Sequence, residues 1–593
     1  MMKQWLAAGA MALALVAPCA SHAAVDAAET KKLHAMFDAD WEDTMRRNPE
    51  YATDVGDLRY NDKLTDASKA ARDEADQHAR DMLKQARAVQ RAKLSAQDQL
   101  SLELFIHGKS EAVEAQKFAG YRSMIIGARG GPHSGLAELC TNVPMNNALQ
   151  AQQLLKRFAA HPKAVDDSMV QLREGLAIGW VPARPVLDRA LEQIDKQLAV
   201  PADDSPWYAP FKRLHKDIPA AERDKLQAAA REAIARDVVP PLRKLRAFIE
   251  TDLKPKAPVE GALKNNAGGP QVYDFLVRRR TTTPLTAKQV HEIGVRELTS
   301  IRAEMEAVMR EVKFQGDFAK FVNYLNTDPE FYYKEPDDLL NGYRAVGKRI
   351  DAELPRLFAE LPRVPWGVRA MPAYMGPDAS EYYDAPPLDG TKPGYFNANV
   401  QGLETKPKWG MAALTAHEAV PGHHLQGSRA RELKGLPKFR RDAWYVAYVE
   451  GWALYAESLA REVNIYDDPY SLFGYLQYRA FRAARLVVDT GIHSMGWTRE
   501  QAIDHMTERT GMDRNFVASE IDRYTSWPGQ ALGYMIGALK FQELRDKAKA
   551  QLGDRFDVRR FHNVVIDNGP LPMDVLERVV AEWVAREKLA AAH

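Results

Sequence analysis

The chain has 593 residues, of which 46% are apolar, and its 81 basic side chains nearly balance 80 acidic ones. This length and apolar content allow a large core and more than one domain. Because no long run of one charge occurs, the composition argues against a nucleic-acid scaffold or a protein that binds a membrane surface.

Residues 1–24 have the pattern of a cleavable export signal. Lys3 precedes an apolar run, Leu6–Pro18, that is too short to span a bilayer. The small residue Ala23 suits signal peptidase, which would start the mature chain at about residue 25. A proline directly before Cys19 argues against a lipid anchor there. We therefore expect an exported protein, periplasmic or secreted, with no membrane-spanning helix after the signal.

Helical periodicity dominates the chain as far as about residue 361. Apolar residues recur three and four positions apart over residues 27–113, 148–161, 165–176, 185–198, 220–250 (with an interruption at Pro240-Pro241), 286–312 and 335–361. The segment 254–270 is the richest in Pro, Gly and Asn, a composition typical of loops. It predicts a linker between an N-terminal helical half, 25–253, and a C-terminal helical half, 271–593, that carries the site.

Two short strands are expected in residues 362–400, which are rich in Pro, Gly, Tyr and Asp. The candidates are Ala373–Met375 and Gly394–Val400. The second strand could hold an extended peptide by strand addition, with Asn397 as a candidate substrate-binding residue. The sequence therefore predicts a mainly α fold with a small β element beside the site.

The segment Met411–Gln426, MAALTAHEAVPGHHLQ, begins as an apolar helix and contains His417 and Glu418. Imidazoles and carboxylates are costly to bury unless they are paired or bound to metal. The commonest zinc-hydrolase helix places its second histidine four residues after the first. Here Pro421 occupies that position. A zinc site in this segment therefore needs a departure from regular helix.

Two histidines compete for the position of second ligand. On a regular helix that starts from His417, His423 would point about 120° away, and His424 would lie about 10 Å along the axis. Pro421 and Gly422 can interrupt the helix and return one of them to the ion. We favour His423, because it needs the smaller insertion, and keep His424 as the alternative.

A third ligand is expected on the segment Trp444–Leu459, which is apolar on almost every side. Glu450 lies in the middle of this predicted buried helix, where an unpaired carboxylate would be strongly destabilising. Glu457 shares its face and suits a hydrogen bond to a ligating histidine. Three protein ligands leave zinc an open position for water, and Glu418 would then be the general base.

Two later segments, Tyr478–His493 and Asp522–Lys540, offer donors to the developing oxyanion and to the substrate. The candidate catalytic residues are Tyr524, Tyr534 and His493. The candidate substrate-binding residues are Arg523, Arg482 and Gln530. The alternatives are that Arg482 and Arg485 are paired only to stabilise the fold, and that the tyrosines pack in the core. Asp489 and His493 are four residues apart and could bind a second metal ion. We prefer a role in which they support the metal ligands or contact the substrate.

The motifs HEAVPGHHLQ, EGWALYAE, DTGIH and RYTSWPGQALGY together resemble the domain-of-unknown-function 885 family over most of the mature chain. The resemblance implies a large helical fold related to gluzincin peptidases, such as angiotensin-converting enzyme and thimet oligopeptidase, with a deep, narrow cleft. It also implies that Glu450 binds zinc. The sequence departs from that group in the longer spacing between Glu418 and the next histidine. Dipeptidyl peptidase III also has an insertion at this place and still binds zinc, but its insertion is smaller.

The sequence thus predicts an exported zinc peptidase that hydrolyses short peptides, as a carboxypeptidase, dipeptidase or oligopeptidase. One alternative is a zinc amidase or esterase that acts on a non-peptide substrate. A second is a periplasmic peptide-binding protein whose hydrolase site has decayed. The intact Glu418 beside His417 argues against decay, and a purely structural metal site would need a fourth protein ligand.

Overall fold

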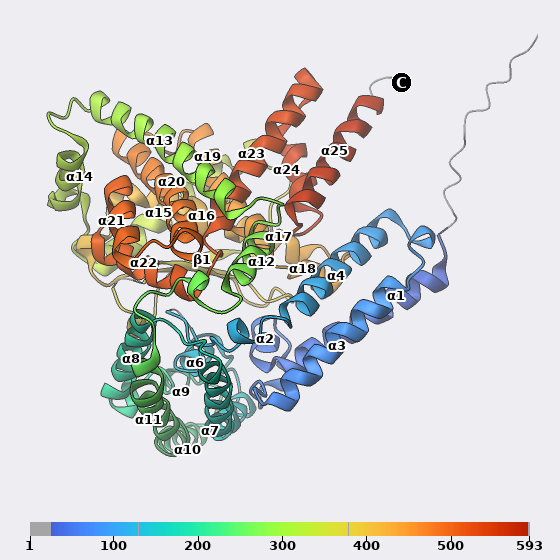
Figure 1. Cartoon of the computed structure of the whole chain (residues 1–593), viewed down its shortest axis with the longest axis vertical. Coiled ribbons are helices and arrows are strands. Elements are labelled where there is room, and N and C mark those ends of the chain that lie inside the picture. Colours follow the sequence, from blue (N-terminus) through green and yellow to red (C-terminus); the bar gives the residue numbers. More distant parts are fainter. Residues whose placement is uncertain (1–24, 129, 378, 591–593) are drawn as a thin grey trace, which may run out of the picture.

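The computed structural model describes residues 25–128, 130–377 and 379–590. It consists mainly of helices with one small sheet, which confirms the predicted fold class (Figure 1). The predicted export signal, residues 1–24, lies outside the described residues. Within the described part, every helix is too short or too polar to cross a membrane.

The N-terminal helices form a long hairpin and a separate lobe. They are α1 (Ala27–Arg47), α2 (Pro49–Asp54), α3 (Lys69–Arg87), α4 (Ala96–Ala115), α5 (Ala119–Arg122), α6 (Gly135–Asn142), α7 (Ala148–Ala177), α8 (Arg184–Ala199), α9 (Ala209–Lys212), α10 (Ala220–Ala233) and α11 (Val239–Phe248). Helices α1, α3 and α4 lie side by side, whereas α6 to α11 gather around a core of their own (Figure 1). Side chains of Asp26, Ser68 and Ser95 accept the first backbone N–H groups of α1, α3 and α4, as N-caps do.

The C-terminal helices surround the largest core. They are α12 (Gly269–Thr281), α13 (Ala287–Glu311), α14 (Phe318–Thr327), α15 (Pro336–Leu357), α16 (Met411–Glu418), α17 (His423–Glu432), α18 (Lys438–Arg441), α19 (Val446–Glu462), α20 (Pro469–Thr490), α21 (Arg499–Thr510), α22 (Arg514–Ser526), α23 (Leu532–Leu552), α24 (Val558–Ile566) and α25 (Met573–Ala590). Leu100 and Leu104 of α4 pack into the same core, so the hairpin is joined to it. The predicted linker, 254–270, contains short 3-10 helices, and the division into two halves remains a prediction.

The sheet contains three strands, β1 (Trp366–Ala370), β2 (Tyr382–Asp384) and β3 (Gly394–Ala398). β3 is central; β1 is parallel to it, and β2 is antiparallel to it. The predicted strand Gly394–Val400 is therefore confirmed in its first five residues. The predicted strand Ala373–Met375 is wrong, because these residues form a 3-10 turn between Pro372 and Gly376. Gly376 has a φ of 86°, which strand residues do not adopt.

Helix α19, which carries Glu450, is held closely against α23. At their crossing, a side chain at Gly537 would place its Cβ 1.8 Å from the carbonyl oxygen of Ala447. Likewise, a Cβ at Gly451 would lie 2.5 Å from the Cα of Gly537. Only glycine allows the two backbones to approach this closely. The contact fixes the position of the helix turn next to Glu450.

Candidate metal centre

A bend between α16 and α17 sets the positions of the two histidines. Helix α16 ends at Glu418, and α17 begins at His423. A Cβ at Gly422 would lie 2.0 Å from the carbonyl oxygen of His417, so the bend requires glycine there. The indole Nε1 of Trp452 donates a hydrogen bond of 2.9 Å to the Pro421 carbonyl, which ties the bend to α19.

His417, His423 and Glu450 converge at this bend. One donor atom from each lies within 4.8 Å of the other two. Nε2 of His417 is 3.8 Å from Oε2 of Glu450, and Nε2 of His423 is 3.3 Å from the same oxygen. The imidazole rings stand nearly perpendicular, with centroids 4.9 Å apart. Two imidazole nitrogens and a carboxylate oxygen form a donor set that suits zinc.

Glu457 lies about two helical turns beyond Glu450 on α19 and orients His417. Its Oε1 lies 2.8 Å from Nδ1 of His417, and both side chains are buried. This bond favours the tautomer with the proton on Nδ1, which leaves Nε2 as the lone-pair atom that faces Glu450. The arrangement is the one expected for a metal-ligating histidine with a carboxylate behind it.

The electrostatics of the three donors favour ionised Glu450. Burial opposes its charge, but hydrogen bonds and charges from His417 and His423 outweigh burial and hold its pKa well below the usual range. Glu418 behaves in the opposite way. The pKa of Glu418 is raised to about 7, chiefly by burial; the charge of His423 opposes the rise, and the charge of Glu450 contributes to it. Glu418 stands beside the donor group without belonging to it.

The donor group opens onto a cavity of about 770 Å³. His417, Glu418, His423 and Glu450 all line it, and Tyr382 and Tyr383 of β2 line another part. A cavity of this size matches a small-molecule or short-peptide site.

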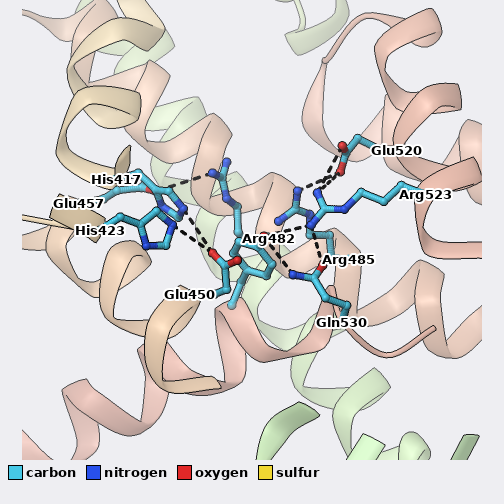
Figure 2. A network of polar contacts seen from close by, with 10 residues as sticks. His417, His423, Glu450, Glu457, Arg482, Arg485, Glu520, Arg523 and Gln530 are labelled. Atoms are coloured by element: carbon cyan, nitrogen blue, oxygen red, sulfur yellow. Dashed lines mark hydrogen bonds and ion pairs between the residues drawn. The ribbon is translucent and has the colours of Figure 1, made fainter. Parts of the chain in front are cut away.

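Across the cavity from the donor group lie Arg485 and Arg523, whereas Arg482 reaches toward Glu457 on the donor side (Figure 2). Arg482 and Arg485 of α20 and Arg523 of α22 line the same space as the donor group. Figure 2 shows the histidines and Glu450 on one side, and Arg485, Arg523 and Glu520 on the other. The cavity thus has one pole that suits a cation and another that suits an anion.

The structure brings several of the predicted residues to this cavity. Tyr534 stacks on the His417 ring, with centroids 6.1 Å apart and planes at 11°. Nη2 of Arg523 donates to the Tyr534 hydroxyl at 3.0 Å and to Oε1 of Gln530 at 2.6 Å. Nη2 of Arg482 lies 4.0 Å from Oε1 of Glu457. These contacts join the two poles through Tyr534.

Other predicted residues lie elsewhere. The Tyr524 hydroxyl is buried between Glu520 and Arg485, outside the cavity lining. His493 makes two hydrogen bonds within the core. Its Nδ1 accepts from the Leu263 amide at 3.2 Å, and its Nε2 donates to the Tyr524 carbonyl at 3.0 Å. Neither side chain reaches the donor group, so the structure gives neither a catalytic position.

Asn397 and His424 are also used in other contacts. The Asn397 amide bonds Arg369 at 2.6 Å and Asp384 at 3.1 Å within the sheet, away from the cavity lining. Nδ1 of His424 lies 2.9 Å from the Tyr383 hydroxyl, and burial lowers its pKa to about 4. Of the two histidines considered for the second ligand, the structure places His423 in the donor group.

Tyr383 and Glu520 were not predicted from the sequence, and Arg485 was considered both as a donor and as a structurally paired residue. Tyr383 reaches the cavity from a three-residue strand, a feature too short to predict. Glu520 joins Arg485 and Arg523 across two helices. The only signal for Glu520 was an acidic residue three positions before Arg523 on one predicted helix, which is also common on solvent-exposed faces.

Fold and site together define a mainly helical protein whose buried His417 and Glu450 and half-buried His423 converge at a cavity of about 770 Å³. The chain belongs to the family described as "Bacterial protein of unknown function (DUF885)", whose model matches residues 49–580. No curated protein matches the sequence.

Two solved structures share the fold. One, described as a "putative lipoprotein" from Colwellia psychrerythraea, has a TM-score of 0.88 and 28% identity, covering 94% of this chain and 99% of that one. Another, described as a "putative lipoprotein of unknown function" from Shewanella oneidensis, has a TM-score of 0.69 and 17% identity, covering 93% and 99%. The second likeness, at this identity, concerns the fold alone.

Proposed function

We propose that the protein is an exported zinc-dependent peptidase that hydrolyses short peptides. The observation that carries this proposal is the convergence of His417, His423 and Glu450 at a cavity with Glu418 beside them. The description of the solved structure from Colwellia psychrerythraea as a "putative lipoprotein" supports export. The relation to gluzincin peptidases belongs to the same proposal.

His417, His423 and Glu450 would hold the zinc ion. The donor types fit it, and three ligands from the described residues would leave a coordination position open to the cavity. When bound, Zn²⁺ polarises a carbonyl and lowers the pKa of water. The protein supplies the ligand geometry through the bend at Gly422 and through the bond from Glu457 to His417.

Glu418 would move the proton. Its side chain lines the cavity beside the donor group and is not needed as a ligand. As general base it takes a proton from the attacking water, and as general acid it returns that proton to the leaving amine. This double role explains why a carboxylate is retained in an otherwise apolar helix.

Tyr534 would stabilise the oxyanion. Its hydroxyl accepts hydrogen bonds from Nη2 of Arg523 at 3.0 Å and from the Gln530 amide at 3.4 Å. A tyrosine hydroxyl accepts two bonds and donates one, so its proton remains for a partner in the cavity. The two acceptor bonds fix its orientation beside His417, as electrostatic stabilisation requires.

Replacing Glu457 by glutamine is expected to weaken zinc binding by about 10- to 100-fold, because a ligating histidine loses the carboxylate behind it. Competition with a chromogenic chelator measures this affinity. Glu462→Gln on the same helix is the matched control, because its carboxylate pairs with Arg545 near the surface. Equal zinc affinities of the Glu457→Gln variant and wild-type protein would contradict the assigned role.

Metal removal tests the activity itself. Purified protein is expected to contain close to one zinc ion per chain and to cleave members of a short-peptide library. A chelator should abolish cleavage, and added Zn²⁺ should restore it. Cleavage of ester or non-peptide amide substrates alone would favour an amidase or esterase. Peptide binding without turnover would favour a decayed peptide-binding protein.

A further inference from the structure

We propose that Arg485 and Arg523 form a subsite for the free α-carboxylate of a peptide, so that the protein acts at the carboxyl ends of its substrates. This inference rests on the proposed peptidase function and specifies its substrate class. It concerns the pole of the cavity opposite the donor group.

The arginines are unusual in being both buried and part of the cavity wall. Arg482, Arg485 and Arg523 are only 4%, 3% and 4% exposed, yet all three line the space that His417 and Glu450 line. Charged side chains are rarely buried this deeply without full pairing. Their pairing therefore decides whether they serve the fold or a ligand.

Pairing within the cluster leaves positive charge uncompensated. Nη2 of Arg485 donates to Oε2 of Glu520 at 2.9 Å, and Nη1 of Arg523 donates to the same oxygen at 3.2 Å. Among the described residues, the other side chains to which these two guanidinium groups donate are neutral, namely Tyr524, Gln530 and Tyr534. Two guanidinium groups thus share one hydrogen-bonded carboxylate.

Two neighbouring carboxylates already have other partners. Asp489 accepts from the Tyr273 hydroxyl at 2.6 Å and from the Gly529 amide at 3.1 Å. Asp522 pairs with Arg189 and Arg499. Surplus charge in a buried cluster is costly unless an anion compensates it. A ligand carboxylate in the cavity would supply that anion.

Donors also remain unused. Among the residues described, Nη1 of Arg485, Nε of Arg523, and both Nε and Nη1 of Arg482 have no hydrogen-bond partner. Buried polar atoms are normally satisfied, so each exception calls for an explanation. The one free nitrogen of Arg485 and the one free nitrogen of Arg523 can each donate to one oxygen of a carboxylate, and such charged hydrogen bonds are among the strongest in proteins.

The position of the cluster relative to the donor group orients a peptide. Tyr534 connects them, since its ring stacks on His417 and its hydroxyl accepts a hydrogen bond from Arg523. The two poles are therefore about one aromatic side chain apart. An extended residue spans roughly 3.5 Å, so a carboxylate on the arginines would bring an amide bond close to the chain end to the donor group. A bond deep inside a long chain would gain nothing from this subsite.

Binding to an inactive variant tests the subsite separately from catalysis. The probes are N-acetylated tripeptides ending in alanine, phenylalanine, lysine or glutamate, each as a free acid and as an α-amide. Calorimetry with zinc-loaded Glu418→Gln protein is expected to show at least one free acid that binds about 10- to 100-fold more tightly than its amide. Equal affinity of every acid and amide pair, or binding of no free acid, would overturn the proposal.

Substitutions assign the preference to residues. In the Glu418→Gln background, Arg523→Gln and Arg485→Gln should reduce the preference for the acid to about twofold or less, because each variant loses a charged donor to the carboxylate. Arg523→Lys keeps the charge but loses the guanidinium N–H groups, and it should give an intermediate preference. This variant provides the test if a glutamine variant fails to fold. Arg479→Gln on α20, whose side chain pairs with Glu297, is the control and should keep the full preference. An unchanged preference in the folded Arg523 and Arg485 variants would overturn the assignment.

The two proposals fail in different ways. If wild-type protein cleaves acids and amides equally well, the peptidase proposal stands and the carboxylate subsite is wrong. If the inactive variant prefers acids but wild-type protein cleaves no peptide, the subsite stands and the peptidase proposal is wrong. Where both hold, mass spectrometry should find products released from the carboxyl end of free acids and none from amides.

Discussion

Replacing Glu418 by glutamine is expected to lower the turnover number for peptide hydrolysis by about 10²- to 10⁴-fold, the usual contribution of a general base. Zinc content should stay at the wild-type level, because Glu418 is not one of the three converging donors. Glutamine keeps the shape of the side chain but cannot accept the proton. Single-turnover kinetics together with elemental analysis measure the two effects on the same sample.

Glu404→Gln is the matched control for this substitution. Glu404 lines the same cavity but is exposed and lies outside the donor group, so its variant should keep wild-type turnover. Wild-type turnover in the Glu418→Gln protein would contradict the general-base role. Loss of zinc from that protein would instead show that Glu418 is needed to hold the ion.

Replacing Gly422 by alanine is expected to destabilise the zinc-free protein by about 3 kcal/mol or more, at the upper end of overpacking effects. The added Cβ would lie 2.0 Å from the carbonyl oxygen of His417 and 2.4 Å from that of Ala416. Both oxygens belong to helix backbone, so relief must shift the end of α16 together with His417. Zinc affinity should fall as well. Urea unfolding and a zinc titration measure the two changes.

Gly427→Ala provides the control within the same element. Gly427 lies in α17, and a Cβ there would meet nothing within 4 Å. Alanine in place of a helical glycine is expected to increase the free energy of unfolding by about 0.5–1 kcal/mol. A Gly422→Ala protein with wild-type stability and wild-type zinc affinity would show that the bend does not depend on glycine.

The central elements of the fold and of the site follow from local sequence. His417 and Glu450 stand out because each interrupts an apolar helix, where an unpaired polar group is costly. Glu457 follows from Glu450, because a spacing of seven residues returns to the same helix face. These inferences need only helix periodicity, and the structure brings the three side chains together.

The choice between His423 and His424 needed tertiary information. The path of residues 419–422 depends on the bond from Trp452 to the Pro421 carbonyl, between segments 31 residues apart. Sequence could show that the helix must break there, but not which histidine the break would turn toward Glu450. His423 was favoured because it needs the smaller insertion, and the structure places His423 in the donor group.

Residues that depend on long-range partners were harder to assign. Tyr524 and Tyr534 look alike in sequence, yet Glu520 holds one hydroxyl in the core while Arg523 holds the other at the cavity. His493 serves as a core hydrogen-bonding group, and Asn397 serves the sheet. A polar residue on a predicted buried face can satisfy either a ligand or the core, and only its three-dimensional neighbours separate the two.

The position of the metal tests the central claim most directly. Crystals of the zinc-loaded protein, measured on both sides of the zinc absorption edge, should show an anomalous peak about 2.0–2.2 Å from Nε2 of His417, Nε2 of His423 and a carboxylate oxygen of Glu450. A peak coordinated by His424 in place of His423 would contradict the assigned ligand set. Zinc bound elsewhere in the chain, with these three side chains left uncoordinated, would contradict the metal centre itself.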